Sequence, residues 1–306
     1  MNFKKLMPYL TFVFVIVVGY VLFRSLSSLD WAKIKEALQN VPFHIFLPGL
    51  SLSLINYTIL SHYDYLGIRF FKLPLGYLRS LISAFFCYVF NLNLGSLVGG
   101  LAFRFRIYMG WGISKEKVPL IMLFSTITNW TGYLFLVSLL MSFEPTVVSV
   151  LIDFSLPVIR FIGLVGIAVV AVYFVLCCKS YKMSFKGNEF KFPSCKLAAT
   201  QMLLSCTQWC IMAVIVYTFF IYFKIDITYR QVLFTYLMAS IAGLIAHIPA
   251  GLGVIEAIFL KLRLEVNSED LVIALICFRI VYYLVPLLIA LPGYLYLEFF
   301  QRKRNE

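Results

Sequence analysis

The sequence predicts an all-α integral membrane protein, and three observations point to this class. Hydrophobic residues make up 62% of the chain and charged residues only 13%, whereas soluble domains are about half apolar and one quarter charged. The mean hydropathy is +0.92. The apolar residues form long continuous runs, unlike the alternating pattern of a transmembrane β-strand. We therefore expect one polytopic transmembrane domain over residues 1–306, built from helices that satisfy their own backbone polar groups.

The apolar runs predict about eight crossings, each close to the length that spans a bilayer. They lie at about 8–23, 43–61, 80–103, 119–143, 156–178, 197–223, 232–248 and 271–297. The first run follows Lys4 and Lys5, as in a signal peptide, but it is long for one, and we expect a retained helix. The segment at about 30–39 places apolar and charged residues on opposite helical faces, which predicts an amphipathic helix on the membrane surface.

Basic residues in the loops predict the orientation. The loop 179–196 carries lysines against Glu189 alone and should face the cytoplasm. The loop 144–155 contains Glu144 and Asp153 but no Lys or Arg, and should face outside. Lys4, Lys5 and the tail Arg302-Lys303-Arg304 place both termini inside. Eight crossings alone cannot satisfy these assignments, because one passage is missing near 91–112 and another near 247–264.

Both gaps contain glycine-rich sequence, which predicts broken or re-entrant helices. The hinge candidates are Gly99 and Gly100 in the first gap, and Pro249, Gly251 and Gly253 in the second. Irregular backbone at membrane depth is tolerated where it is enclosed by protein or lines a cavity. The first passage should run inward and the second outward, which is consistent with an inverted repeat of the kind transporters use.

Ionisable side chains in or near the predicted membrane segments are the candidate site residues, because placing each one inside a membrane costs about 2.5–3.5 kcal/mol. They are Asp64, Arg104, Arg106, His247, Glu256 and Arg279, with Tyr108 beside the arginines. Gly100, Arg104 and Tyr108 are four residues apart and would share one helix face. A guanidinium there would bind a phosphate through two hydrogen bonds, or would extend to the lipid headgroups at a helix end.

The remaining candidates each have two interpretations. We expect Arg279 to pair with Glu256, which would either cap the helix that follows Gly253 or take up a proton during transport. His247 would titrate or simply form a hydrogen bond beside the broken helix. Asp64 would mark the end of a helix in the interface, where tyrosines are also common.

Several function classes are excluded by missing motifs. The sequence contains no phosphate-binding loop for ATP and no H-E-x-x-H zinc motif. The seven cysteines have no metal-ligand spacing, and we expect reduced thiols, no metal and no cofactor. The net charge of +12 is spread between apolar runs, which does not suit nucleic-acid binding.

Two motifs resemble the signature stretches of the lysylphosphatidylglycerol synthase/flippase transmembrane family. They are Gly99-Gly100-x-x-x-Arg104-x-Arg106-x-Tyr108 and Pro249-Ala250-Gly251-Leu252-Gly253-Val254-Ile255-Glu256. Arg279-x-x-Tyr282-Tyr283 and Tyr63-Asp64-Tyr65 also match, so the resemblance covers nearly the whole chain. Ala250 departs from the pattern, in which glycine is expected. The resemblance implies the membrane part that is linked to moving aminoacylated phosphatidylglycerol between leaflets. A chain of this length is not expected to hold the separate aminoacyl-transferring domain.

The predicted function is therefore that of a flippase-like protein of the bacterial cytoplasmic (inner) membrane, not of an enzyme. It would translocate or bind an anionic phospholipid or lipid-linked substrate without ATP hydrolysis. Arg104 and Arg106 would hold the headgroup, while Glu256 and Arg279 would separate and pair again. One alternative is a membrane-embedded headgroup transferase that uses Asp64 and Glu256. Another is a non-catalytic subunit of an envelope complex. Membrane lipids are the expected partners, and a homo-oligomer is left open.

Overall fold

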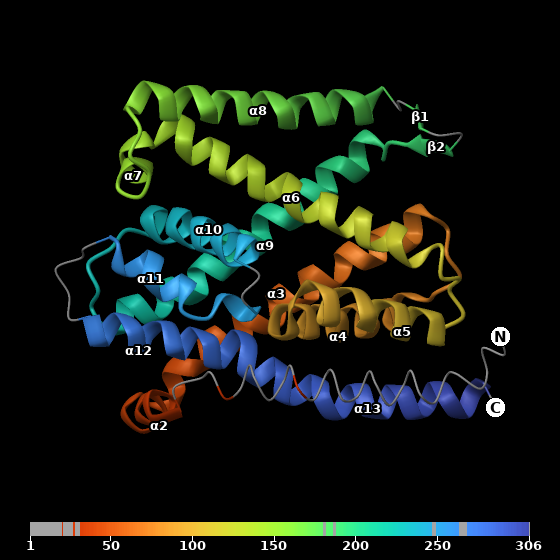
Figure 1. The fold of residues 1–306 in the computed structure, drawn as a ribbon, viewed down its shortest axis with the longest axis horizontal. Coiled ribbons are helices and arrows are strands. Elements are labelled where there is room, and N and C mark those ends of the chain that lie inside the picture. The colour runs from red at the N-terminus through yellow and green to blue at the C-terminus, as the bar shows by residue number, and fades with distance from the viewer. Residues whose placement is uncertain are drawn as a thin grey trace.

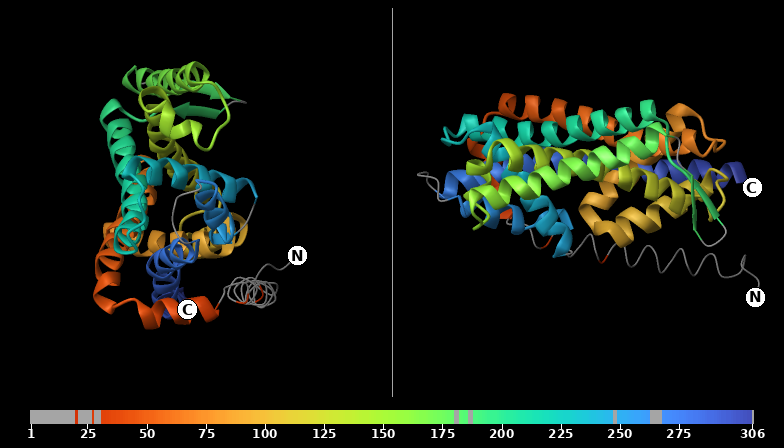
Figure 2. Two further views of the ribbon diagram at one scale, coloured as in Figure 1. Left: turned by 90° about the vertical axis from the view of Figure 1, so that its left-hand side faces the viewer. Right: turned by 90° about the horizontal axis from the view of Figure 1, so that it is seen from above.

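The computed structural model is a helical bundle elongated along one axis (Figures 1 and 2). It describes residues 20, 27, 31–179, 182–185, 188–246, 249–262 and 268–305. The elements before the midpoint of the chain are α2 (Trp31–Asn40), α3 (Phe43–Phe70), α4 (Tyr77–Gly95), the π-helix η1 (Ser96–Ala102), α5 (Phe103–Gly110), α6 (Val118–Phe143) and α7 (Pro145–Ser149). They are followed by α8 (Leu156–Cys178), β1 (Lys182–Phe185), β2 (Asn188–Lys191), α9 (Cys195–Tyr222), α10 (Tyr229–Ile245), the 3-10 turn η2 (Pro249–Gly251), α11 (Val254–Leu260), α12 (Ser268–Arg279), the π-helix η3 (Ile280–Leu284) and α13 (Val285–Asn305).

The predicted all-helical membrane architecture is confirmed. In the described part of the chain, six helices are long and apolar enough to cross a membrane, and the apolar helix α10 is shorter. The expected crossings after the first coincide with α3, α4, α6, α8, α9, α10 and the continuous α12–η3–α13 element, which we call the C-terminal rod. The first expected crossing, at about 8–23, lies outside the described residues. The helix α2 falls where the amphipathic segment was predicted, and its Trp31 is exposed.

Helix starts follow local sequence signals. Prolines lie in the first turn of α6 and α8, where a missing backbone N–H costs nothing. The side chain of Ser194 accepts a hydrogen bond from Leu197 N at the start of α9. Thr228 and Gln231 form a capping box that begins α10. The boundaries of the long helices therefore reflect sequence, while their apolar surfaces decide how they pack.

The first glycine-rich segment is a helical hairpin, which we call hairpin 1 (α4–η1–α5). The helix expected at 80–103 ends instead at Gly95, whose φ of +81° breaks the helix. The chain then returns along α4, and the rings of Phe90 and Phe103 stack with centroids 4.1 Å apart. A β-carbon at Gly99 would overlap the carbonyl oxygen of Phe90. Glycine is required here because the two backbones touch.

The second glycine-rich segment also doubles back and forms hairpin 2 (α10–η2–α11). Its turn contains positive φ angles at Ala250 (55°), Gly251 (57°) and Gly253 (76°). Helix α10 ends at Ile245 rather than near 248, and His247 lies outside the described residues. In Figure 1, hairpin 1 lies in the half of the bundle where α13 ends, hairpin 2 lies in the other half, and η2 packs against α4.

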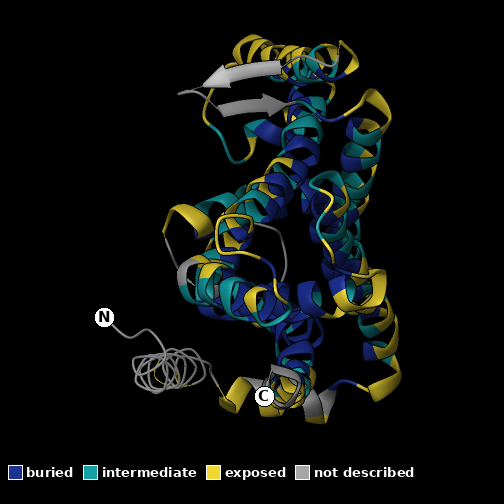
Figure 3. Ribbon diagram, turned by 90° about the vertical axis from the view of Figure 1, so that its right-hand side faces the viewer, coloured by how far each residue is buried: buried dark blue, intermediate teal, exposed yellow. Residues whose placement is uncertain are grey.

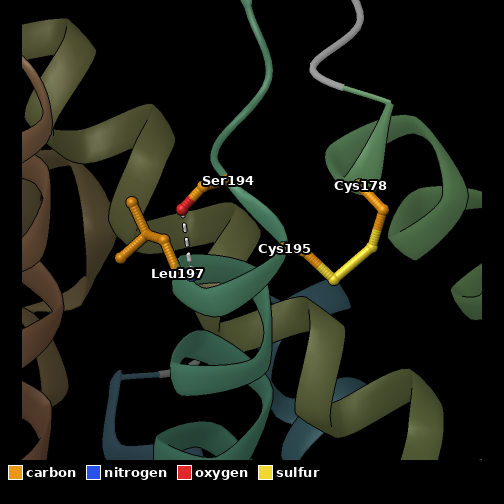
Figure 4. The surroundings of a disulfide bond; sticks show 4 residues. All are labelled: Cys178, Ser194, Cys195 and Leu197. Carbon is orange, nitrogen blue, oxygen red and sulfur yellow. Dashed lines mark hydrogen bonds between the residues drawn. A yellow bond between two sulfur atoms is a disulfide. The ribbon is translucent and has the colours of Figure 1, made fainter.

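The connection between α8 and α9 differs from the expectation of reduced cysteines. Strands β1 and β2 form an antiparallel hairpin in which Lys182 lies opposite Lys191. At its base, Cys178 and Cys195 form a disulfide, with their Cα atoms 4.4 Å apart (Figure 4). The expectation failed for this pair because a polar loop gives no periodic signal that it will reverse and bring its two ends together.

Buried residues gather in the interior of the bundle and exposed ones on its outer faces (Figure 3). In the most apolar stretch of α8, only 17% of the residues are buried. The helix lies at one edge of the bundle (Figure 1). Its outward side chains include Phe161 and Leu164, as expected for a lipid-facing helix. In the most apolar stretch of the C-terminal rod, 67% of the residues are buried. The rod is therefore a central element, and α8 is a peripheral one.

Candidate functional site

Asp64 is the centre of a polar cluster inside the bundle. Its carboxylate is fully buried, near the C-terminal end of α3. It accepts hydrogen bonds from Ser125 Oγ at 2.6 Å, Tyr108 OH at 2.7 Å and Tyr88 OH at 3.0 Å. These donors come from α6, α5 and α4, so one carboxylate ties three elements to α3. Asp64 thus lies near a helix end, but other helices enclose it and it does not face the membrane interface as was expected.

Arg104 supplies the charge that Asp64 needs. Its Nε donates to Asp64 Oδ2 at 3.1 Å and its Nη2 donates to Asp64 Oδ1 at 3.3 Å. Its Nη1 donates to the carbonyl of Gly100 at 3.3 Å, and its guanidinium lies 4.6 Å from the centre of the Tyr88 ring. Gly100, Arg104 and Tyr108 do share one helix face, as their spacing predicted. Because Arg104 is buried, its guanidinium makes a bidentate interaction with the Asp64 carboxylate. It does not extend to lipid headgroups at a helix end.

Arg106 faces a different partner, Glu298 of α13. Its Nε donates to Glu298 Oε2 at 3.1 Å, and its Nη2 contacts Oε1. The side chains are 24% and 20% exposed, compared with 6% for Arg104 and 0% for Asp64. Two arginines two residues apart therefore lie in unlike surroundings. Arg104 is locked in the interior, and Arg106 belongs to a pair that solvent or headgroups can reach.

Glu256 and Arg279 are in contact, as expected. Arg279 Nε donates to Glu256 Oε1 at 2.6 Å and Nη2 donates to Oε2 at 2.9 Å. The same guanidinium donates to the carbonyls of Ala250 at 2.8 Å and Gly251 at 2.9 Å. It thereby satisfies two backbone acceptors that the turn of hairpin 2 leaves without helical partners.

The two arginine clusters are joined through the π-helical turn of the rod. Tyr283 lies 5.9 Å from the Arg279 guanidinium, measured to the ring centre. Its carbonyl accepts a hydrogen bond from Asn93 Nδ2 of α4 at 3.4 Å. At the adjacent residue, Tyr57 OH donates to the carbonyl of Tyr282 at 3.0 Å. Buried polar contacts therefore connect hairpin 1, the rod and hairpin 2 (Figure 1).

The geometry limits what chemistry the candidates can perform. Asp64 and Glu256 belong to separate clusters, each bound to its own arginine. They do not form the acid–base pair that a headgroup transferase was expected to use. Among the residues that the structure describes, no group of three His, Cys, Asp or Glu side chains could hold a metal ion. A phosphate that binds an arginine of the site would compete with the carboxylate that this arginine already contacts.

Several residues of the site were not found from the sequence. Glu298 lies just past the end of the last expected crossing, and its isolation after an apolar run was the one signal available. Tyr88, Ser125 and Asn93 gave no signal, because a polar residue in an apolar helix does not reveal which neighbour it faces. Those three side chains matter here only through the carboxylate or carbonyl group that they contact.

Comparison with known proteins gives consistent relatives. The family model described as "Lysylphosphatidylglycerol synthase TM region" matches residues 10–290. The inner membrane protein YbhN of Escherichia coli is 33% identical over 96% of this chain and 92% of its own length. An uncharacterized protein of Synechocystis is 25% identical over 86% of the chain and 82% of its own length. Phosphatidylglycerol lysyltransferase of Staphylococcus aureus is 25% identical over 92% of the chain, which spans only 32% of that relative.

Proposed function

The chain belongs to the lysylphosphatidylglycerol synthase transmembrane family, and we propose that it moves a phospholipid or a lipid-linked substrate between the leaflets of the bacterial inner membrane. The names of its relatives support this proposal, since one is an inner membrane protein and another acts on phosphatidylglycerol. An anionic phospholipid is the favoured substrate. Transport is downhill or coupled to an ion, because the sequence holds no nucleotide-binding motif.

The observation that carries the proposal is the pair of oppositely placed hairpins. Hairpin 1 occupies one half of the bundle and hairpin 2 the other, and η2 packs against α4 (Figure 1). Discontinuous helices that enter from opposite sides and meet near mid-membrane are typical of transporters built from inverted repeats. Each hairpin contributes one member of an arginine–carboxylate pair: Arg104 of hairpin 1 pairs with Asp64, and Glu256 of hairpin 2 pairs with Arg279. Intramembrane charges of this kind mark substrate or ion pathways.

The charge distribution favours one orientation. Figure 1 places the α3–α4, α5–α6 and α8–α9 connections at the end of the bundle where α13 terminates. The charged residues in or beside these connections include Arg69, Lys72, Arg79, Lys115, Glu116, Lys117, Lys179 and Lys196. The helix α2, the α6–α7–α8 and α9–α10 connections, the end of α11 and the start of α12 lie at the opposite end. Their charged residues include Lys33, Lys35, Glu36, Glu144, Asp153, Arg160, Lys224, Asp226, Arg230, Lys261, Glu269 and Asp270. The first end is strongly basic and the second is balanced. By the positive-inside rule the first end faces the cytoplasm, and hairpin 1 opens to that side.

A transport cycle follows from the ion pairs. A headgroup phosphate that enters hairpin 1 meets Arg106 first, because this side chain is more exposed than Arg104. Binding there requires Glu298 to give up Arg106, and binding at hairpin 2 requires Glu256 to give up Arg279. Exchange of one anion for another keeps each guanidinium paired, which avoids the cost of an isolated buried charge.

The lysyltransferase relatives raise the alternative that the chain is an enzyme. The chain spans about a third of their length. We propose that the shared part handles lipid and that aminoacyl transfer belongs to the rest of those proteins. The separate positions of Asp64 and Glu256 support this view. The third hypothesis, a non-catalytic subunit of an envelope complex, would be favoured by a stable partner in a mild-detergent pull-down.

The test is lipid scrambling in liposomes that contain the purified chain. Wild type should move an acyl-labelled phosphatidylglycerol to the other leaflet faster than empty liposomes do. Glu256→Gln and Arg106→Lys should slow this movement while the proteins stay monodisperse. Glu144→Gln is the matched control, because Glu144 pairs with the exposed Arg230. If wild type moves no anionic, zwitterionic or polyprenyl lipid, with or without an ion gradient, the translocation proposal is wrong.

A further inference from the structure

We propose that the C-terminal rod (α12–η3–α13) links the movements of the two hairpins, and that Glu298 is the positioning residue that holds hairpin 1 to it. The inference rests on the proposed function, since coupled hairpins matter only if the hairpins move. It is drawn from four features of the rod: its contact with each hairpin, the opposite polarity of its two ion pairs, the π-helical turn between them, and their unequal burial.

The first half of the rod is bound to hairpin 2. Arg279 is the last residue of α12, and it makes four hydrogen bonds to hairpin 2, two to Glu256 and two to the carbonyls of Ala250 and Gly251. Because the two backbone acceptors lie in the turn itself, the position of α12 fixes the shape of the turn as well as the place of α11.

The second half of the rod is bound to hairpin 1. Glu298 pairs with Arg106, and Gln301 Nε2 donates to the carbonyl of Ile107 at 3.2 Å. The Tyr294 ring lies 5.4 Å from Phe90 and 5.0 Å from Phe103, between ring centres. These two rings belong to opposite arms of hairpin 1, so α13 contacts both arms. Movement of α13 therefore displaces hairpin 1 as a unit.

The two ion pairs are opposite in polarity. The rod supplies the cation to hairpin 2, through Arg279, and the anion to hairpin 1, through Glu298. At hairpin 2, an anionic headgroup would compete with Glu256 for Arg279 of the rod. At hairpin 1, it would compete with Glu298 of the rod for Arg106. The same ligand thus replaces hairpin 2 as the partner of the rod on one side, and replaces the rod as the partner of hairpin 1 on the other.

A π-helical turn joins the two halves. The turn η3 widens the helix, which leaves carbonyl groups without their usual helical donors. Two carbonyls of this turn, on Tyr282 and Tyr283, accept hydrogen bonds from the side chains of Tyr57 of α3 and Asn93 of α4. The rod is therefore anchored at its midpoint by neighbouring helices. A shift of one half about this point is passed to the other half, because the chain is continuous through it.

The unequal burial of the pairs decides which one opens. The Arg104–Asp64 pair is almost fully buried, and separating it would leave an unpaired charge inside the bundle. The Arg106–Glu298 pair is about one-quarter exposed, so its members can be solvated when they separate. Hairpin 1 can thus part from the rod at Glu298 while Asp64 and Arg104 keep its internal structure.

The test is hydrogen–deuterium exchange of the purified full chain, read by mass spectrometry. Glu298→Gln should raise the exchange of hairpin 1 amides, and it should also raise the exchange of residues 249–262 in hairpin 2 by about fivefold, as expected for loss of one modest stabilising contact. The double variant Arg106→Glu/Glu298→Arg restores opposite charges at this site and should return both hairpins toward wild-type exchange. The control is Tyr173→Phe, which removes a hydrogen bond from α8 to Gln201 of α9 and should change neither hairpin.

Two results would overturn the coupling. Faster exchange confined to hairpin 1 would mean that the rod does not pass movement to hairpin 2. Failure of the charge-swapped variant to protect hairpin 2, when it does protect hairpin 1, would mean the same. If Glu298→Gln does not yield folded protein, Gln301→Ala removes the neighbouring bond to Ile107 and is read in the same way. These outcomes need no transport assay. If liposomes with wild-type protein showed no lipid scrambling, the proposed function would be refuted, and the exchange measurements would still decide whether the rod couples the hairpins.

Discussion

Gly99 packs against the carbonyl oxygen of Phe90 so closely that a β-carbon at position 99 would overlap this oxygen. Such contact lets the two arms of hairpin 1 lie side by side, as small residues do between membrane helices. Because the clash would be with backbone rather than with a movable side chain, hairpin 1 cannot relax around a larger residue. The glycine is thus required by packing and not only by backbone conformation.

Gly99→Ala should therefore destabilise the protein by about 3 kcal/mol or more, at the upper end of overpacking effects. Thermal unfolding in detergent, followed by size-exclusion chromatography, measures the change. Gly76→Ala is the control, because no atom lies within 4 Å of its β-carbon position and its φ is not positive. A Gly99→Ala protein that unfolds at the wild-type temperature would contradict the hairpin geometry.

Asp64→Asn should also be strongly destabilising. The substitution removes the charge that pairs with the buried Arg104 and replaces one acceptor oxygen by a donor that faces hydroxyl donors. Breaking a buried pair from one side costs about 3–5 kcal/mol. Glu144→Gln breaks the exposed pair with Arg230, where the side chains are 34% and 62% exposed, and should cost under about 1 kcal/mol.

The comparison of these two variants is the informative measurement. Equal unfolding temperatures for Asp64→Asn and Glu144→Gln would mean that Asp64 is solvated and that the cluster around it is not a structural centre. A large difference would assign Asp64 and Arg104 to stability, and would leave Arg106, which is paired with Glu298, as the arginine of hairpin 1 for which a headgroup would compete.

The sequence predicted the hairpins for a physical reason. The Lys and Arg content of the loops restricts which ends of the helices can face the cytoplasm, and glycine-rich segments such as 99–100 are the places where a helix can break. It also predicted that Arg279 pairs with Glu256, because a guanidinium deep in an apolar run needs a partner and few acids are available.

Other features could not be predicted. Arg106 and Glu298 are 192 positions apart, and nothing local indicates which acid an interfacial arginine will meet. The donors to Asp64 come from three different elements, so they become neighbours only after the helices pack. The pairing of Cys178 with Cys195 depends on the reversal of a polar loop, for which apolar periodicity gives no information.

Ala250→Gly should leave the protein slightly more stable. Ala250 has φ 55° and ψ 10°, a left-handed conformation that costs a residue with a β-carbon about 1–2 kcal/mol. Glycine avoids this cost but loses about 0.4–1 kcal/mol through its more flexible unfolded state, so the net gain should be at most about 1 kcal/mol. Ala257→Gly, within helix α11, should instead lower stability by about 1 kcal/mol. A lower unfolding temperature for Ala250→Gly would show that the alanine methyl group contributes packing that outweighs the strain.

The Cys178–Cys195 pair tests the orientation of the bundle. If the basic end faces the cytoplasm, both thiols should be reduced in growing cells, where disulfides are rare. Acid-quenched cells treated with a polyethylene-glycol maleimide under denaturing conditions should then label both residues. After purification and incubation with oxidised glutathione, labelling should fall by two sites, and Cys195→Ser should show no such fall.

Oxidation should also change stability, because it closes a loop with a sequence separation of 17 residues. Closing a loop of this size raises the free energy of unfolding by about 3 kcal/mol at most, so oxidised wild type should unfold at a higher temperature than reduced wild type, and Cys195→Ser should not respond. A pair already oxidised in cells would contradict the cytoplasmic assignment. It would place β1 and β2 outside, reverse the side from which each hairpin opens, and make hairpin 2, with Glu256 and Arg279, the cytoplasmic entrance.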